Sequence, residues 1–352
     1  MQDVIENLSR TIREAASRRR PLCIRGGGTK DFYGGETRGD VLDTRACRGI
    51  VSYEPTELVI TARAGTPLAE IDAALRAEGQ MLAFEPPRFG EGATLGGCIA
   101  TGLSGPRRVY AGAVRDFVLG VRVLDGSGNE LRFGGQVMKN VAGYDVSRLM
   151  VGSLGTLGVL LEVSLKVLPL PVAEITLRRE HSQTEALALM DEWSRMPLPF
   201  SASCHAGNQL CFRLSGAEAG VRAAREKMGG EEVADGTAFW EKVREQRLEF
   251  FGQPGPLWRL SVRSSMPPLD LPGTQLIEWS GALRWLKSDA GAAMVRDAAA
   301  GAGGHATLFR AEDKSAGAFH PLPAALMKLH RRLKQNFDPA GILNPGRMYP
   351  DL

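Results

Sequence analysis

The sequence predicts a two-domain α+β protein, and three observations lead to this fold class. The chain has 352 residues, 43% hydrophobic and 24% charged, which is the balance of a globular protein with well-formed cores. Its first half alternates strand-like and helix-like segments that are joined by glycine-rich stretches. In the later part these stretches thin out, and strands alternate with helices, which suits an antiparallel sheet with helices on one face.

The first elements are a helix, two strands and a second helix. Apolar residues recur at helical spacing over 3–18, which predicts an amphipathic helix. The apolar runs at 21–26 and 57–65 predict strands that end in glycine. We expect Thr66 to cap a helix over 67–79, where Gly79 stops it.

Residues 84–112 are rich in glycine and show little periodicity, so we expect a long loop. Loops of this length in compact domains are usually functional. Residues 118–133 predict two strands around an Asp-Gly-Ser-Gly turn. Residues 155–169 predict one more strand, and the first domain is expected to end at residue 170.

The second domain is expected to combine strands and helices in alternation. Its predicted strands are 173–180, 210–216, 257–264 and 275–286, and its predicted helices are 183–196, 217–228, 239–250 and 289–301. A basic amphipathic helix and a proline-bounded turn close the chain. The predicted domains are therefore 1–170, an α+β domain at 171–312, and a C-terminal segment at 313–352 that packs back toward the first domain.

Charge and hydropathy exclude several functional classes. The net charge of +3 arises from 43 basic and 40 acidic residues that are well mixed, so a general role in binding nucleic acid is not indicated. The sequence has neither an N-terminal signal pattern nor an apolar run of about 18 residues. We expect a cytoplasmic protein, attached to a membrane at most through partners.

The cysteine pattern supports neither disulfides nor a metal site. The five cysteines are odd in number and include no C-x-x-C pair. Zinc and iron–sulfur sites use clustered cysteines, so none is predicted in this chain, and no other metal site is expected. The cysteines are expected to be small packing residues.

Three glycine-rich turns, at 26–28, 90–105 and 152–158, carry the functional signal. A residue without a Cβ lets the main chain approach a ligand closely, and successive amide groups in such a turn form a concave nest for phosphate. One such turn is weak evidence. Three in one domain indicate a large ligand that is approached by backbone from several sides.

Five segments, in order, resemble the FAD-binding (PCMH-type) domain of the vanillyl-alcohol oxidase family. They are RGGGTK (25–30), EGATLGGCIATGLSG (91–105), YAGAVRDFVLGVRVLDGSG (110–128), KNVAGYDVSRLMVGSLGTLGV (139–159) and FDPAGILNPGRM (337–348). The resemblance implies a flavin domain built from two α/β subdomains, followed by a smaller α+β cap domain with an antiparallel sheet.

The resemblance also implies which residues hold FAD. Residues 25–30 would wrap the pyrophosphate, 92–97 with 104–105 would follow the ribityl chain and the flavin edge, and Val159 with the preceding glycines would approach the adenosine. The full implied set is Arg25, Gly26, Gly27, Gly28, Thr29, Lys30, Pro87, Gly92, Ala93, Thr94, Gly96, Gly97, Ala100, Ser104, Gly105, Gly152, Gly155, Gly158 and Val159.

Other residues of these motifs have two readings. Arg115 and Asp116 either begin the strand pair behind the cofactor or form a surface ion pair. For Lys139, Tyr144 and Asp145, a structural role is an equal alternative to a cofactor contact.

Thr29 marks a departure from the family pattern. Many relatives carry His at this position, some carry Cys near Gly92, and these side chains tether the flavin covalently. The resemblance therefore implies that FAD is bound here without a covalent link.

Catalytic residues are harder to assign. Oxidation of a 2-hydroxy acid by a flavin needs a base for the hydroxyl proton and cations for the carboxylate. Lactate and glycolate dehydrogenase relatives use clustered histidines, whereas the five histidines here form no H-x-H and no i, i+4 pair. His320 is the first candidate for a catalytic role, and the catalytic residues are otherwise unknown.

The short second domain and the closing motif resemble FAD-binding subunits of bacterial glycolate oxidases. The resemblance implies a chain that takes part in oxidising glycolate to glyoxylate, together with a larger FAD-containing subunit and an iron–sulfur subunit. Two alternatives remain open. One is a self-sufficient FAD-dependent 2-hydroxy-acid dehydrogenase, and the other is a structural subunit with a vestigial flavin site.

Overall fold

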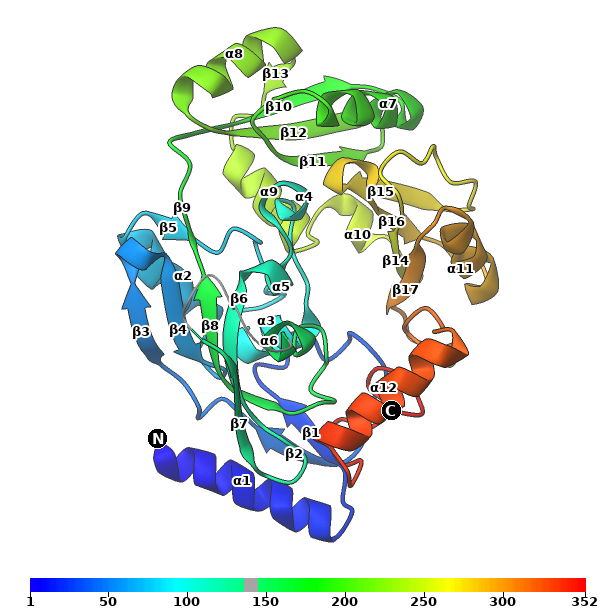
Figure 1. Ribbon diagram of the computed structural model, residues 1–352. Coiled ribbons are helices and arrows are strands. Elements are labelled where there is room, and N and C mark those ends of the chain that lie inside the picture. Colours follow the sequence, from blue (N-terminus) through cyan, green and yellow to red (C-terminus); the bar gives the residue numbers. More distant parts are fainter. Residues whose placement is uncertain (136–144) are drawn as a thin grey trace. The chain divides into compact units, whose positions relative to one another are not determined.

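The computed structural model describes residues 1–135 and 145–352, which pack into two compact units (Figure 1). Unit 1 comprises Met1–Leu103, Ala113–Pro169 and Pro321–Leu352, and unit 2 comprises Ser104–Gly112 and Leu170–His320. The chain thus enters unit 2 briefly at 104–112 and returns for the closing segment. The domain boundaries expected at residues 170 and 312 stay a prediction.

A five-stranded antiparallel sheet forms the centre of unit 1. Its strand order is β3-β4-β8-β6-β7, and the strands are β3 (Ile50–Glu54), β4 (Val59–Arg63), β6 (Val118–Leu124), β7 (Glu130–Gly134) and β8 (Val159–Lys166). The middle strand β8 is buried along most of its length because β4 and β6 pair with it on either side. The hairpin expected over 118–133 is confirmed, and the Asp125 carboxylate accepts the amides of its turn.

A second, smaller layer of unit 1 pairs the parallel strands β1 (Leu22–Arg25) and β2 (Asp40–Asp43). Helix α1 (Gln2–Ser17) buries Ile5, Leu8 and Ile12, whose spacing of three and four residues puts them on one helix face. That face joins a core cluster that also contains residues of β1, β8 and the closing segment. The helix predicted over 3–18 is therefore confirmed.

The remaining elements of unit 1 are short, apart from the closing helix. They are α2 (Leu68–Ala77), β5 (Gln80–Met81), α3 (Leu95–Thr101), α5 (Val114–Phe117), α6 (Val146–Leu149), β9 (Leu168–Pro169) and α12 (Ala324–Phe337), with a single 3-10 turn, η1 (Pro55–Glu57).

Two expectations for this region were wrong. Thr66 does not cap α2, because its hydroxyl binds the backbone of Gly49 and Pro67 occupies the cap position. Residues 84–112 are not a continuous loop, since they contain α3 and the four-residue helix α4 (Arg108–Ala111). Both helices are too short, and α3 too rich in glycine, to give a periodic signal.

Unit 2 is built on an eight-stranded antiparallel sheet, in the order β13-β10-β12-β11-β15-β16-β14-β17. Its strands are β10 (Ala173–Glu180), β11 (Phe200–Ala206), β12 (Gln209–Gly216), β13 (Glu231–Glu232), β14 (Leu257–Ser261), β15 (Thr274–Glu278), β16 (Leu283–Lys287) and β17 (His305–Arg310). Its helices besides α4 are α7 (Gln183–Ser194), α8 (Glu218–Met228), α9 (Gly236–Arg244), α10 (Glu249–Gly252) and α11 (Ala292–Gly301).

Helices cover both faces of this sheet, so the expectation of helices on one face was wrong. Helices α7 and α8 pack on the face that carries Leu177 and Phe212. The opposite face carries Thr176, whose hydroxyl accepts a hydrogen bond from Trp240 of α9. It also carries Trp285, which contacts Phe251 of α10 edge to face.

Other features of unit 2 also differ from expectation. Residues 275–286 form two strands, β15 and β16, joined by the turn η2 (Trp279–Gly281). Residues 239–250 are divided between α9 and α10, and strands β11, β13 and β17 were not predicted. The turn was missed because Trp279 favours strands and Ser280 has no strong preference. In the structure both residues are nevertheless held at positive φ.

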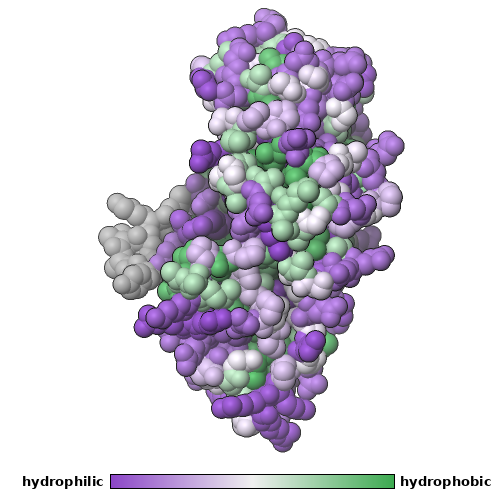
Figure 2. Space-filling model, turned by 90° about the vertical axis from the view of Figure 1, so that its right-hand side faces the viewer, coloured by the Kyte–Doolittle hydropathy of each residue, from purple (hydrophilic) through white to green (hydrophobic). Residues whose placement is uncertain are grey.

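The surface of the molecule is mixed in character. Figure 2 shows hydrophilic residues over much of one face, with apolar residues in separate patches between them. Among residues 1–135 and 145–352, none of the helices has both the length and the apolar character that a membrane crossing requires.

Candidate functional site

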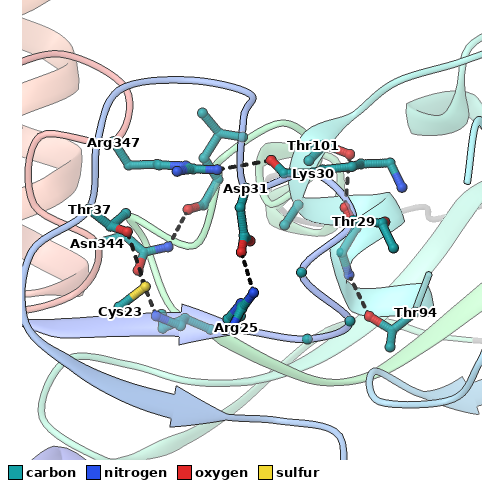
Figure 3. Close-up of a pocket in the computed structure, with 17 residues that line it drawn as sticks. Cys23, Arg25, Thr29, Lys30, Asp31, Thr37, Thr94, Thr101, Asn344 and Arg347 are labelled. Carbon is teal, nitrogen blue, oxygen red and sulfur yellow. Dashed lines mark hydrogen bonds and ion pairs between the residues drawn. The ribbon is translucent and has the colours of Figure 1, made fainter. Parts of the chain in front are cut away.

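A cavity of about 90 Å³ opens in unit 1 at the end of strand β1 (Figure 3). Its walls come from four parts of the chain: β1 with the loop 26–31, helix α3, the segment around Leu154, and the closing segment at Asn344 and Arg347. A second cavity of about 70 Å³ shares six of these lining residues and extends past Gly155 and Gly158.

The loop after β1 supplies main-chain donors to the larger cavity. Within the described residues, the amide groups of Gly26, Gly27, Gly28 and Thr29 donate to no protein acceptor, although all four residues line the cavity. Gly28 takes a φ of +72°, which L side chains rarely adopt. Consecutive amides of this kind form an anion-binding nest that suits a phosphate or diphosphate group.

Close packing of two loops explains why Gly27 has no side chain. A Cβ placed there would lie 1.5 Å from the carbonyl oxygen of Gly92. Gly27 does not have a positive φ, so a left-handed backbone conformation is not what requires glycine at this position. The constraint is the contact between the two glycine-rich segments that the sequence analysis singled out.

Charged groups surround this nest. Arg25 and Asp31 form an ion pair of 2.6 Å across the loop, as Figure 3 shows. The Lys30 side chain is buried, and its ammonium donates to the carbonyl of Arg88 at 3.3 Å. Arg347 donates to the carbonyls of Lys30 and Gly35, each at 3.0 Å, and burial lowers its pKa. The basic groups favour an anionic ligand.

The side chain of Asn344 joins two walls of the cavity. It accepts the amide of Ile24 at 2.7 Å and donates to the carbonyl of Leu154, also at 2.7 Å. The backbone of the closing segment also pairs with Leu22 at the start of β1. Segments more than 300 residues apart in sequence are thereby held at one site.

Lys334 of α12 holds the closing segment in place. Its ammonium donates to the carbonyls of Thr156 and Leu343 and pairs with Asp338 at 2.8 Å. Burial lowers the pKa of Lys334, and the neighbouring Asp338 opposes that effect. Asp338 in turn accepts the amides of Ile342 and Leu343.

Helix α3 supplies the third wall. Thr94 caps it by accepting the amide of Gly97 at 3.3 Å, and Thr101 donates to the carbonyl of Gly97 at 2.8 Å. Gly96 packs against Ala64 with no room for a side chain. The glycines of this motif therefore serve both the helix packing and the cavity wall.

The structure brings most of the expected cofactor residues together. Twelve line one or both cavities: Arg25, Gly26, Gly27, Gly28, Thr29, Lys30, Thr94, Gly96, Gly97, Ala100, Gly155 and Gly158. Neither cavity is lined by Pro87, Gly92, Ala93, Ser104, Gly105, Gly152 or Val159. Ser104 and Gly105 belong to unit 2, and the carbonyl of Gly105 accepts Trp279 Nε1 at 3.0 Å.

Sequence reasoning did not select Asn344, Arg347, Asp31, Thr101 or Leu154, all of which line the larger cavity. The closing motif FDPAGILNPGRM contains Asn344 and Arg347, and its resemblance to the family is the sequence signal that could have identified them.

Of the residues with two readings, Arg115, Asp116 and Asp145 line neither cavity. Arg115 and Asp116 are exposed in α5, and Asp116 accepts the amide of Ala113. Asp145 caps α6 by accepting the amide of Arg148. Lys139 and Tyr144 lie outside the described residues.

His320 lies in unit 2, where its Nδ1 accepts the amide of Ala306 at 3.4 Å. In the part of the chain that the structure describes, no group of three or more His, Cys, Asp and Glu side chains is placed to hold a metal ion. A catalytic role for His320 stays a prediction.

Two family models match this chain. Residues 3–134 match a model described as an FAD binding domain, and residues 322–348 match the C-terminal domain of FAD linked oxidases. The two matched stretches include the amide nest and the Asn344 segment, which meet at the larger cavity.

Among curated proteins, the glycolate oxidase subunit GlcE of Escherichia coli (strain K12) is 56% identical over 350 residues, 99% of each chain. The glycolate oxidase subunit GlcD of Bacillus subtilis (strain 168) is 32% identical over 186 residues, which are 52% of this chain and 39% of GlcD. A D-lactate dehydrogenase of Anaerostipes hadrus is 38% identical over 36% of this chain and 26% of its own length.

A solved structure of alkyldihydroxyacetonephosphate synthase shares the fold. It superposes with a TM-score of 0.68 at 16% identity, covering 97% of this chain and 74% of that one. At 16% identity this similarity supports a shared fold and nothing further.

Proposed function

The chain belongs to the family of FAD-linked oxidase subunits that includes GlcE, and on this premise we propose that it is the FAD-binding subunit of a glycolate oxidase complex. In that role it takes part in the oxidation of glycolate to glyoxylate. The observation that carries the proposal is the run of four amides at Gly26–Thr29 that line the cavity, with Lys30 buried beside them.

The residues of the cavity fit FAD. The nest at 26–29 would hold the diphosphate, because its amides have no acceptor among the described residues and basic side chains lie around it. The smaller cavity past Gly155 and Gly158 would take one end of the cofactor. Thr29 offers no imidazole or thiol for a covalent bond, which supports non-covalent binding.

Bound flavin supplies a two-electron acceptor for the substrate hydride. The residues of this chain contribute the enclosure: Asn344 fixes the end of β1, Arg347 fixes the loop carbonyls, and Lys334 anchors the closing segment. No base for the hydroxyl proton is assigned, and His320 remains the residue to test first.

The partners follow from the family. Relatives named as subunits of one oxidase support a multi-subunit complex. We extend this to a larger FAD-containing subunit and an iron–sulfur subunit, since electrons must leave the complex through carriers. The five cysteines of this chain are free, and among the described residues no three or more ligating side chains are grouped to hold a metal, which agrees with a cluster carried by another subunit.

The proposal is tested by purifying the chain alone and with its candidate partners. Alone, it should be yellow, release flavin on acid precipitation, and fail to reduce a dye with glycolate. When it is mixed with the two partner subunits, dye reduction should appear.

Two other outcomes would favour the alternatives. Rapid bleaching of the isolated chain by glycolate would favour a self-sufficient dehydrogenase. A colourless protein that does not take up added FAD would favour a structural subunit with a vestigial site, and it would overturn the proposal.

A further inference from the structure

Helix α12 leaves most of its surface uncovered. Of its 14 residues only Lys334 is buried, whereas helix α1, with 16 residues, buries five. Leu326 and Leu329 are 47% and 51% exposed, although the apolar side of a helix in a globular protein normally faces a core. We propose that α12 docks into an apolar groove with an acidic rim on a second protein, the larger FAD-containing subunit.

Three leucines of α12 form a stripe along one side of the helix. Leu326, Leu329 and Leu333 are spaced by three and four residues, and with 3.6 residues per turn this spacing aligns them. Leu333, at one end of this leucine stripe, is half-buried. Amphipathic helices that insert into the groove of another protein use anchors at positions i, i+3 and i+7. The leucine stripe matches this pattern.

A basic edge runs beside the leucine stripe. The helix carries Lys328, Arg331, Arg332 and Lys334, and it contains no acidic residue. Arg331 and Lys334 are paired with carboxylates of the segment that follows the helix. Lys328 and Arg332 are exposed, lie one turn apart, and form no ion pair with any residue that the structure describes. Carboxylates on the rim of a partner's groove would complement this edge.

The charge of α12 argues against a second copy of this chain as the occupant. Both members of a two-fold symmetric pair present the same surface to each other. A second α12 would therefore bring further cations to Lys328 and Arg332 and no carboxylate. Like charges that meet at an interface oppose binding. We therefore infer a different protein as the occupant.

The exposed side chains also fit a protein groove better than a membrane surface. Helices that lie in a membrane surface insert a large apolar face, which commonly includes Trp or Phe. The exposed apolar residues of α12 are two leucines and two alanines, and no aromatic side chain is exposed in this helix. So small an apolar surface is better suited to a shaped groove.

The identity of the partner rests on the proposed function, whereas the chemistry of the surface does not. Relatives of this chain are named as two subunits of glycolate oxidase, GlcE and GlcD. Helix α12 belongs to unit 1, whose residues also line the candidate FAD cavity. A partner docked on α12 would therefore be attached to the unit that holds the flavin.

The test is titration of the full-length protein with the purified larger subunit by biolayer interferometry. Saturable binding is expected for the wild type. Binding at least about tenfold weaker is expected for Leu329→Gln and for the double variant Lys328→Glu with Arg332→Glu. Because the basic edge contributes, the affinity of the wild type should also fall as the salt concentration rises.

Two variants on other helices are matched controls. Met294→Gln, at a 56% exposed position of α11, removes an exposed apolar side chain as Leu329→Gln does. Arg222→Glu with Lys227→Glu, at exposed positions of α8, makes the same change of net charge as the double variant in α12. Both controls should bind the larger subunit like the wild type. If the double variant of α12 fails to fold by circular dichroism, Lys328→Gln with Arg332→Gln replaces it.

Four results would overturn the inference. They are no saturable binding by the wild type, unchanged affinity in either α12 variant, dimerisation of the wild type that Leu329→Gln abolishes, and binding to phosphatidylglycerol vesicles that the double variant abolishes. The flavin content is measured in each sample. A chain that binds FAD but not the larger subunit would overturn this inference and leave the flavin site standing. A colourless chain that still binds the subunit through α12 would contradict the proposed function and support this surface.

Discussion

At the scale of single residues, Gly27 shows how backbone contact defines the candidate site. Its missing Cβ leaves the space that the carbonyl of Gly92 occupies, so the two glycine-rich loops touch directly. Any side chain would push them apart and displace the amides that line the cavity. The neighbouring Gly28 is constrained differently, through its positive φ.

Gly27→Ala should therefore weaken FAD binding by about tenfold or more, which corresponds to about 1.4 kcal/mol. The measurement is flavin affinity by fluorescence titration. Gly220→Ala is the matched control, because Gly220 lies in helix α8 with open space around its Cβ position. Equal affinities for the wild type and Gly27→Ala would show that this loop does not hold the cofactor.

His205 gives a prediction for the dependence of stability on pH. It is buried in β11, its Nε2 bonds the carbonyl of His181 at 2.9 Å, and burial lowers its pKa from 6.5. The unfolded chain therefore binds the proton more readily than the folded protein does. The free energy of unfolding should decrease as the pH falls below 6.5.

His205→Gln keeps a possible donor to the carbonyl but does not titrate, so its free energy of unfolding should fall less over the same pH range. Urea unfolding at several pH values measures the difference. His330→Gln, in helix α12, is the control for removal of a histidine. The same decline in the His205→Gln variant and the wild type would contradict the assignment.

At the scale of elements, the closing segment completes unit 1. Strand β1 receives a parallel bridge from Leu343, and the Asn344 side chain satisfies one amide and one carbonyl at the cavity. A core cluster joins α1, β1, β8 and this segment. The N-terminal and C-terminal ends of the sequence thus belong to one packed structure.

Asn344→Ala should leave the amide of Ile24 and the carbonyl of Leu154 without their partner. The expected loss is about 2–4 kcal/mol of unfolding free energy, together with weaker FAD binding. Urea denaturation and flavin titration measure the two effects. Asn336→Ala, at an exposed position of α12, should change neither quantity, and a similar loss in both variants would argue against a specific role.

Lys334→Met tests the ion pair and hydrogen bonds by which Lys334 holds that segment. Removing the ammonium leaves Asp338 buried without its ion-pair partner and leaves two carbonyls without their donor. Breaking a buried pair from one side typically costs about 3–5 kcal/mol. The double variant Lys334→Met with Asp338→Asn should recover part of the loss in urea unfolding. Additive losses would mean that the two groups do not interact energetically.

At the scale of the whole molecule, the candidate cofactor cavity is lined by residues of unit 1 alone. FAD should stabilise unit 1, by about 2.7 kcal/mol when the free cofactor is at 100 times its Kd. Hydrogen exchange should therefore slow at 22–30, 94–101 and 342–347 when FAD is added. Protection by FAD that is confined to unit 2 would contradict the placement of the cofactor.

The sequence alone determined the local elements and the cofactor class. Helix α1 and the β6–β7 hairpin follow from helical periodicity and turn chemistry, both of which are short-range properties. The loop 25–30 was recognisable as a candidate ligand-binding loop because three successive glycines after a strand allow the backbone to approach a ligand closely. FAD followed from the resemblance of five ordered segments to a known FAD-binding family.

Only the tertiary structure decided which distant groups meet. Asn344 reaches Ile24 across 320 positions, and Arg108 meets Arg259 on Trp279, although no local pattern relates these residues. The η2 turn was read as part of a strand because its positive φ values are imposed by packing and by the Ser203 and Gly105 hydrogen bonds. Contacts of this kind depend on the packing of the whole unit, and this packing cannot be predicted from a short window of neighbouring residues.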